Sequence, residues 1–245
     1  MDTEMQINYK KSLEYWSEIP ATVDGVLGGF GFISDVDIDG SRLFLKSILS
    51  LQNAPRIERA LDCGAGIGRI TKLLLIPSFN SVDLVEPDEK FISSVNSFVG
   101  DDSHKLGTLY KVGLHEFKPE KKYDVIWNQW VLAYLTDEDL VSYFIRYLLN
   151  ALKKIKKIRV YVLFKKDALS HNGVIVVKEN VTSSGTLEVD AVDSSVTRSL
   201  KQFISIFKKA KLKRIKQCKQ TNFPNGIYPV YMFALVADTE MEISV

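Results

Sequence analysis

The amino-acid sequence predicts an α/β protein with a mostly parallel sheet that helices cover on both faces. From residue 60 onward, short apolar runs alternate with longer stretches of helical periodicity. The chain then closes on two consecutive strand-like segments, 212–220 and 227–237, which predict an antiparallel pair at the end of the sheet. A chain of 245 residues is long enough to form one such domain, 1–245, with a sizeable core.

The N-terminal residues 1–52 are expected to form a helical and glycine-rich cap on this domain. Residues 3–17 and 41–51 have the periodicity of two amphipathic helices. The segment between them, "TVDGVLGGFGFISDVDIDG" (22–40), is rich in glycine, and we expect it to be irregular.

Strands and helices alternate in order along the rest of the chain. Helices are expected from near Arg69, over 88–98, after Thr136 as N-cap, and over 194–212, where Asp193 or Ser194 would be the cap. The first five predicted strands are 59–63, 81–86, 108–113, 123–131 and 172–180.

The topology predicts where a ligand would bind. In open parallel sheets, ligands bind outside the carboxyl ends of the strands. The segments at these ends, where we expect the site, are 63–68, Glu86, 113–115, 128–130 and Asn180.

Composition limits the classes of partner. Residues 154–170, "KIKKIRVYVLFKKDALS", have a local charge of +5 in a chain of net charge +2, so the remainder is mildly acidic and no nucleic acid is expected as partner. Cys63 and Cys218 lie far apart without metal-ligand spacing, which predicts no metal and a reduced, cytoplasmic protein. "MDTEMQINYKK" is no signal peptide and no apolar run spans a bilayer, so no membrane partner is expected.

A glycine loop follows the first strand. "LDCGAGIGR" (61–69) has the spacing G-x-G-x-G, which by itself also suits a tight strand-to-helix turn. Glu86 ends the next strand 22 residues after Gly64, where a carboxylate can accept two hydrogen bonds from a ribose diol. Arg69 opens a helix, where the dipole disfavours a cation, and this indicates an anionic partner.

This loop, with Asp62 ahead of its first glycine, resembles motif I of class I S-adenosylmethionine-dependent methyltransferases rather than the G-x-G-x-x-G of dinucleotide sites. Further blocks make the chain similar to one family from near residue 15 to near residue 235: the protein α-N-terminal methyltransferases, which methylate the free amino terminus of X-Pro-Lys proteins. The blocks are "YWSEIPATVDGVLGGFG" (15–31), "LDCGAGIGRITK" (61–72), "YDVIWNQWV" (123–131), "NGVIVVKEN" (172–180), "DAVDSSVTRS" (190–199) and "IYPVYMFAL" (227–235).

The resemblance implies a Rossmann-like fold with a mostly parallel seven-stranded sheet, and S-adenosyl-L-methionine as cofactor. The substrates it implies are proteins that begin X-Pro-Lys, with Ala, Ser or Pro as X after removal of the initiator Met. The cofactor-binding residues it implies are Trp16, Gly64, Gly66, Arg69, Glu86, Pro87, Asp88, Leu114, His115 and Gln129.

The same resemblance implies an acceptor site for the N-terminal tail of a substrate protein, with ribosomal proteins as expected partners. Asn180, Asp190 and Asp193 would surround the reacting terminus, with Asp190 holding the basic side chain behind it and Asp193 nearest the amine. Substrate-binding roles are implied for Trp130, which would pack on the second-position proline, and for Leu27, Gly28, Tyr134, Ile227 and Tyr228.

Several of these residues have structural alternatives. Trp127 and Trp130 also suit a buried core, and the period of the strand does not decide which of Trp127, Gln129 and Trp130 faces the pocket. Gln129 is informative because a polar amide that ends an apolar strand requires partners. His104 and His115 are expected at the surface, and neither is expected to be a base.

The sequence departs from the family pattern at Tyr134. The family places a histidine there, in the context G-H-L-[TP]-D, where this chain has "AYLTD" (133–137). That histidine is a favoured general base, so we expect Asp193 to accept the proton directly or through a water that Tyr134 orients. The departure keeps two alternatives open: a weakly active or inactive cofactor-binding paralogue that stabilises a partner, or a methyltransferase of this fold with another substrate.

The basic segment 154–170 is a second departure, because the family joins the flanking elements by a short turn. Three interpretations remain open: a surface excursion without a role, a loop that docks substrate or RNA, and intron sequence carried into the reading frame. The expected location is cytoplasmic, with the nucleus as a second compartment. The extent of methylation and the oligomeric state are not predicted.

Overall fold

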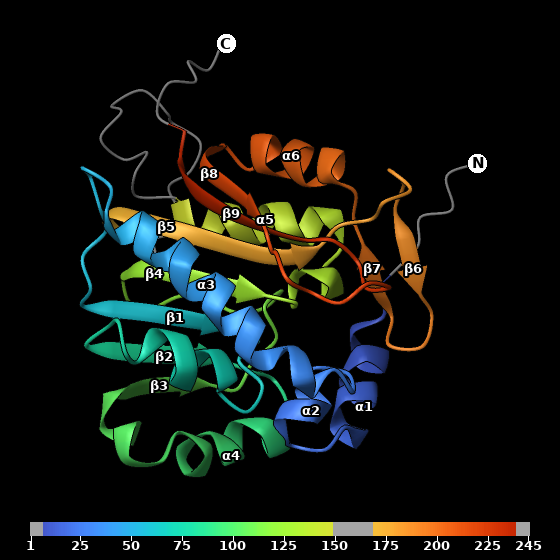
Figure 1. Ribbon diagram of the computed structural model, residues 1–245, viewed down its shortest axis with the longest axis horizontal. Helices are drawn as coiled ribbons and strands as arrows, with labels where there is room; N and C mark the ends of the chain where they lie inside the picture. The colour runs from blue at the N-terminus through green and yellow to red at the C-terminus, as the bar shows by residue number, and fades with distance from the viewer. Residues whose placement is uncertain (1–6, 149–168, 239–245) are drawn as a thin grey trace.

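The computed structural model describes residues 7–148 and 169–238, and it has the predicted mixed sheet at its centre (Figure 1). The seven strands are ordered β3-β2-β1-β4-β5-β9-β8. The first five strands along the chain are parallel, and β9 and β8 continue the sheet in antiparallel pairing, as predicted. Their bounds are β1 Arg59–Cys63, β2 Ser81–Val85, β3 Leu106–Tyr110, β4 Tyr123–Gln129, β5 Leu169–Asn180, β8 Leu212–Lys219 and β9 Val230–Ala237.

Helices cover both faces of the sheet, and each face has its own apolar cluster. Figure 1 shows α3 (Ser34–Leu49) crossing one face. The cluster there joins α3, the helical turn Thr71–Leu75 and α4 (Glu89–Val99) to the sheet through side chains such as Ile48, Leu74 and Val95. The cluster on the other face contains side chains of α5 (Asp137–Leu148) and α6 (Leu200–Lys209). Because helices of the described ranges cover both faces, the strand ends are where a site is expected.

The N-terminal cap is more regular than predicted. It contains α1 (Tyr9–Glu18), α2 (Val23–Val26), a 3₁₀ turn (Gly31–Ile33) and α3, which begins at Ser34 rather than near residue 41. The Thr22 hydroxyl caps α2 by accepting from the Gly25 N–H, and two acids in the first turn of α3 favour its N-terminal dipole. Position 40, inside α3, is occupied by glycine because a Cβ there would come within 2.2 Å of Gln220 Oε1.

The helix predicted from residue 194 begins six residues later. Residues 195–197 form β7 (Ser195–Thr197), which pairs with β6 (Glu188–Asp190) in a hairpin separate from the main sheet. The N-cap of α6 is Ser199, whose hydroxyl accepts from the Gln202 N–H in a capping box. Neither Asp193 nor Ser194 caps this helix. Both lie in the turn of the hairpin, where each side chain accepts a backbone N–H.

Besides the basic segment 154–170, positive charge in the sequence is concentrated in residues that form one edge of the sheet. Residues 200–220 contain eight lysines and arginines and no acid. They form α6 and β8, and lysines on an edge strand such as β8 are a common protection against edge-to-edge pairing. Residues 154–168 of the basic insertion lie outside the described residues, and 169–170 begin β5. Within the described ranges, no helix has the length and apolar character needed to cross a membrane.

Candidate active site

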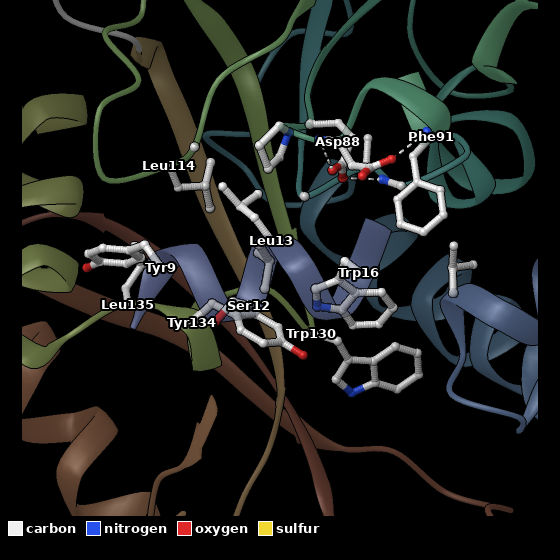
Figure 2. Close-up of a pocket in the computed structure, with 18 of the residues that line it drawn as sticks. Tyr9, Ser12, Leu13, Trp16, Asp88, Phe91, Leu114, Trp130, Tyr134 and Leu135 are labelled. Carbon is white, nitrogen blue, oxygen red and sulfur yellow. Dashed lines mark hydrogen bonds between the residues drawn. The ribbon is translucent and has the colours of Figure 1, made fainter. Parts of the chain in front are cut away.

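Two adjoining hollows lie at the carboxyl ends of the parallel strands. The smaller cavity has a volume of about 440 Å³ and the larger, which we call the acidic cleft, about 1070 Å³. Trp130, Trp16 and Tyr134 line both, so the two communicate around these aromatic rings. Figure 2 shows the smaller cavity, with Leu13 and Trp16 of α1 facing Trp130 and Leu114. All ten residues predicted to bind the cofactor line this cavity: Trp16, Gly64, Gly66, Arg69, Glu86, Pro87, Asp88, Leu114, His115 and Gln129.

The glycine loop forms one wall of the smaller cavity. Gly64 and Gly66 have φ values of +67° and +56°, in the left-handed region that favours glycine. A Cβ on Gly64 would lie 2.3 Å from Cγ2 of Val131, so any other residue there would require Val131 or the loop to shift. The loop therefore presents bare backbone to the cavity at the point where β1 ends.

Glu86 lies beside this loop at the end of β2. Its Oε2 accepts from the Gly66 N–H at 2.8 Å and its Oε1 from the Asp88 N–H at 2.9 Å. Asp88 in turn caps α4 by accepting from the Phe91 N–H at 3.0 Å. Burial raises the pKa of Glu86 to about 7, against the lowering effect of these two N–H donors. The carboxyl is fixed in orientation and has lone pairs left for the hydroxyls of a ribose.

A buried charge cluster supports the other end of the cavity. Asp37 of α3 bonds Arg69 Nη2 at 2.8 Å, Lys178 Nζ at 2.5 Å and Gln129 Nε2 at 2.9 Å. Burial lowers the pKa of Lys178, and the charge of Asp37 opposes this effect. One carboxylate thus faces two basic groups, and of these Arg69 lines the cavity, where it can face an anion. Arg69 is not solvated, and its partner within the chain, Asp37, was not predicted.

The end of β4 resolves which aromatic residue faces the cavity. Trp127 is fully buried in the core and donates to Gln129 Oε1 at 3.0 Å, whereas Gln129 and Trp130 line the cavity. Trp130 has a φ of +52°, and Glu179 Oε1 holds the turn that follows by accepting from the N–H groups of Val131 and Leu132. The Trp130 Nε1–H is buried and has no partner in the described part of the chain, which leaves a donor for a ligand.

Helix α1 covers the smaller cavity, which the sequence did not predict in detail. Tyr9 stacks on His115 with ring centroids 4.0 Å apart, and Trp16 meets Tyr134 edge-on at 6.0 Å. His115 is therefore half-buried against α1 rather than a free surface residue, while His104 is exposed as expected. Because Asn8 N–H donates to Ser194 Oγ at 2.8 Å, α1 is also tied to the β6–β7 hairpin.

The acidic cleft contains all nine residues predicted for substrate and catalysis: Leu27, Gly28, Trp130, Tyr134, Asn180, Asp190, Asp193, Ile227 and Tyr228. Its lining among the described residues includes four carboxylates, of Glu179, Glu188, Asp190 and Asp193, and no lysine or arginine. The cleft is thus a site for a cation, assembled from segments that are far apart in the sequence.

Tyr134 bonds directly to Asp193. Its hydroxyl donates to Asp193 Oδ2 at 2.6 Å, and Asp193 Oδ1 accepts from the Ser195 N–H at 3.0 Å. Burial, with the adjacent Asp193 charge, raises the pKa of Tyr134 well above its usual value. Tyr134 therefore stays protonated and orients Asp193, and it is not a base.

Other lining residues were missed in the sequence. Tyr9 and Leu13 precede the predicted Trp16 at the spacing i, i+4, i+7, and this apolar stripe is the signal that could have assigned the rest of α1 to the cavity. Glu179 and Glu188 flank predicted residues but carry no motif of their own. No local signal marks Asp37, because only the packing of α3 on the sheet brings it to Arg69.

The fold and the cavity together define a class I S-adenosylmethionine-dependent methyltransferase. The sheet has seven strands with an antiparallel end. The cavity combines glycines that expose backbone, a carboxyl placed for a ribose and an arginine placed for a carboxylate. A family model described as AdoMet dependent proline di-methyltransferase matches residues 4–236, and the chain belongs to this family.

Similar proteins cover nearly the whole chain. It is 44% identical to Alpha N-terminal protein methyltransferase 1 of Drosophila melanogaster, over 92% of this chain and 75% of that protein. It is 42% identical to N-terminal Xaa-Pro-Lys N-methyltransferase 1 of Homo sapiens, over 93% of this chain and 94% of that protein. A solved S-adenosylmethionine-dependent methyltransferase of Leishmania major is 36% identical, with a TM-score of 0.79 over 93% of this chain and 82% of that one. These relatives do not favour an inactive paralogue or a different substrate.

Proposed function

We propose that this protein methylates the α-amino group of proteins that begin X-Pro-Lys, with Ala, Ser or Pro as X after removal of the initiator Met. The observation that carries the proposal is the acidic cleft, which has no lysine or arginine among its described lining residues and opens onto the smaller cavity at Trp130. An amine that becomes a cation needs such a surface beside the methyl donor. The relatives named for N-terminal Xaa-Pro-Lys methylation support the same assignment.

The reacting amine must be neutral before it can act as a nucleophile. An α-amine has a pKa of about 8, so the neutral form costs only about 1 kcal/mol at pH 7. The absence of a histidine at position 134 is therefore tolerable, because orientation of the amine contributes several times more than its deprotonation. Asp193 is held by Tyr134 and by the Ser195 N–H, and it keeps lone pairs to orient the amine and receive its proton.

The residues of the smaller cavity suit the cofactor. S-adenosylmethionine supplies an activated methyl group on a sulfonium centre, and transfer leaves positive charge on the substrate nitrogen. Glu86 would accept from the ribose hydroxyls, and Arg69, which Asp37 holds in place, would face the carboxylate of the amino-acid end. Asn180 and Asp193 in the adjoining cleft would stabilise the ammonium that develops.

The cleft also offers a basis for the X-Pro-Lys preference. The Trp130 ring lies at the junction of the two hollows, where the second residue of a bound terminus would pass, and a proline packs well on an indole. Asp190 lies in β6 of the hairpin that borders the cleft and is exposed to solvent, so it can receive a long cationic side chain.

The test is a methylation assay on a peptide that begins Ser-Pro-Lys, with its N-acetylated twin as control and mass spectrometry as readout. We expect one or more methyl groups on the free terminus and none on the acetylated one. Tight binding of the cofactor without transfer to any free terminus would contradict the proposal. Transfer to the acetylated twin would contradict it as well, because the methyl group would then be on a side chain.

The wider role is part of the same proposal. The partners would be N-terminal tails of substrate proteins, ribosomal proteins among them, which are rich in basic residues and suit an acidic cleft. We also propose a cytoplasmic and nuclear location, in keeping with two free cysteines, and imaging of a tagged chain would test it.

A further inference from the structure

Glu188 is a carboxylate in the acidic cleft that the proposed reaction does not use. Its Oε1 accepts from the Ser184 hydroxyl at 2.6 Å and its Oε2 from the Tyr228 hydroxyl at 2.6 Å. These bonds lower the pKa of Glu188, and the carboxylate stays charged. Both donors are neutral, and no ion pair of Glu188 occurs among the described residues.

The position of Glu188 is at the outer part of the cleft. Its partner Tyr228 lies in the segment that precedes β9 and is 41% exposed, so the Tyr228–Glu188 bond links that segment to the hairpin beside solvent. Both residues line the cleft together with Asp190 and Asp193. Lys11 bonds to this loop, but its Nζ donates to the Ala191 carbonyl at 2.5 Å, and it forms no ion pair with the carboxylates of the cleft among the described residues.

The register of β6 relates Glu188 to Asp190. The two residues are at positions i and i+2 of the strand Glu188–Asp190, so they share a face and are about 7 Å apart along it. An extended peptide repeats its side chains at the same interval. A tail whose third residue lies at Asp190 therefore brings its fifth residue, the next on that side, to Glu188.

We propose that Glu188 is a specificity-determining residue that selects substrate tails with a second Lys or Arg at position 5, two residues after the first cation. This proposal rests on the proposed function, because it extends the same tail along the cleft. Its chemistry is a charge-assisted hydrogen bond from an ammonium or guanidinium group to a carboxylate that two hydroxyls have already oriented. Since Glu188 is only partly buried, the preference should be modest.

The test compares three peptides that begin Ser-Pro-Lys and differ downstream: Ala at positions 4 and 5, Arg at 4 only, and Arg at 5 only. We expect kcat/KM of the intact enzyme to be about 3- to 10-fold higher for Arg at position 5 than for Ala, and Glu188→Gln to lose this preference. Glu120→Gln, an exposed change outside both hollows, is the matched control and should keep it. Added salt should reduce the preference of the unchanged protein.

A charge exchange separates recognition from a structural effect. Glu188→Lys should prefer Glu over Arg at position 5, which a merely disturbed hairpin would not produce. Equal kcat/KM for the three peptides, or a preference that Glu188→Gln retains or that exists only at position 4, would overturn the role of Glu188 while leaving N-terminal methylation standing. Failure to methylate any of the three would instead reject the proposed function.

Discussion

The smaller cavity and the acidic cleft adjoin each other but are built on different principles. The cavity is lined largely by segments that follow the parallel strands, and its charged side chains Glu86 and Arg69 are bonded to the chain itself, while the Trp130 Nε1–H has no partner among the described residues. The cleft has more than twice the volume, about 1070 Å³ against 440 Å³, and is assembled from loops that precede α3, follow β4 and β5 and precede β9. Its carboxylates have hydroxyl and N–H partners and form no ion pair among the described residues, although the charge of Arg198 acts on Glu179. The cavity is preorganised by the fold, and the cleft keeps unneutralised charge for its ligand.

The largest effect is expected on the stability of the protein, from a change in the buried charge cluster around Asp37. Asp37→Asn would leave Arg69 and Lys178 buried without their carboxylate, and loss of one partner in a buried ion cluster costs about 3–5 kcal/mol. Denaturant unfolding should show this loss in the free energy of unfolding. Asp39→Asn is the matched control, since Asp39 lies on the same helix in an exposed pair with Arg42 and should change stability by less than about 1 kcal/mol. Equal stability of the two variants would show that the cluster is not the support of the cavity.

The second-largest effect is expected from Asp193 in the cleft, and it should reduce the rate of the reaction rather than the stability of the protein. Asp193→Asn keeps the size of the side chain but removes the charge that receives the proton and faces the developing ammonium, so we expect kcat to fall about 100-fold or more. The dissociation constant of the cofactor should change little, because Asp193 lines only the cleft. A near-normal kcat at every pH would reject Asp193 as the residue at the amine.

The difference between the two regions also explains how far the sequence could predict them. The sheet and its antiparallel end follow from strand periodicity, and the topology of the sheet predicts that a site lies at the strand ends. The ten cofactor residues, Trp16 of α1 among them, were assigned as a set only by the resemblance to the family. The role of Asp37 could not be predicted, because its contacts cross 32 residues to Arg69 and 141 to Lys178. The hairpin was misread as the start of a helix, because "SSVTRSLKQ" has three serines able to act as caps and the strand 195–197 depends on pairing with β6.

A smaller effect should come from Glu86 and appear as pH dependence. Its pKa is raised to about 7, and hydroxyl donors of a ribose favour the charged form, so binding should lower that pKa and release a proton near neutral pH. Cofactor affinity should then rise between pH 6 and pH 7.5, by about tenfold at most for one group, and level off above. Calorimetry in two buffers of different ionisation enthalpy would measure the proton. Glu86→Gln should bind more weakly and without this slope, and a slope that survives in Glu86→Gln would belong to another group.

The raised pKa of Glu86 also affects the stability of the protein without cofactor. An acid with a raised pKa in the folded state holds more protons when folded than when unfolded, so its contribution to stability falls as pH rises from about 4.5 through 7. Glu179, with a pKa raised to about 7 by burial, acts in the same direction within the cleft. Thermal unfolding without cofactor should therefore show a lower Tm at pH 7.5 than at pH 5.5 from these two groups, and Glu86→Gln should reduce the difference.

The smallest effect tests whether Tyr134 replaces a base or supports one. Tyr134→Phe removes the hydroxyl that bonds Asp193 at 2.6 Å but keeps the ring that meets Trp16, so cofactor binding should persist. A hydrogen bond to a charged group contributes about 1.5 kcal/mol at its lower range, so kcat should fall about 10-fold, less than in Asp193→Asn. In a double variant the two losses should not add, because Tyr134 acts only through Asp193. A loss as deep as that of Asp193→Asn, or full additivity, would assign Tyr134 an independent part in the proton transfer, although its raised pKa argues against such a part at neutral pH.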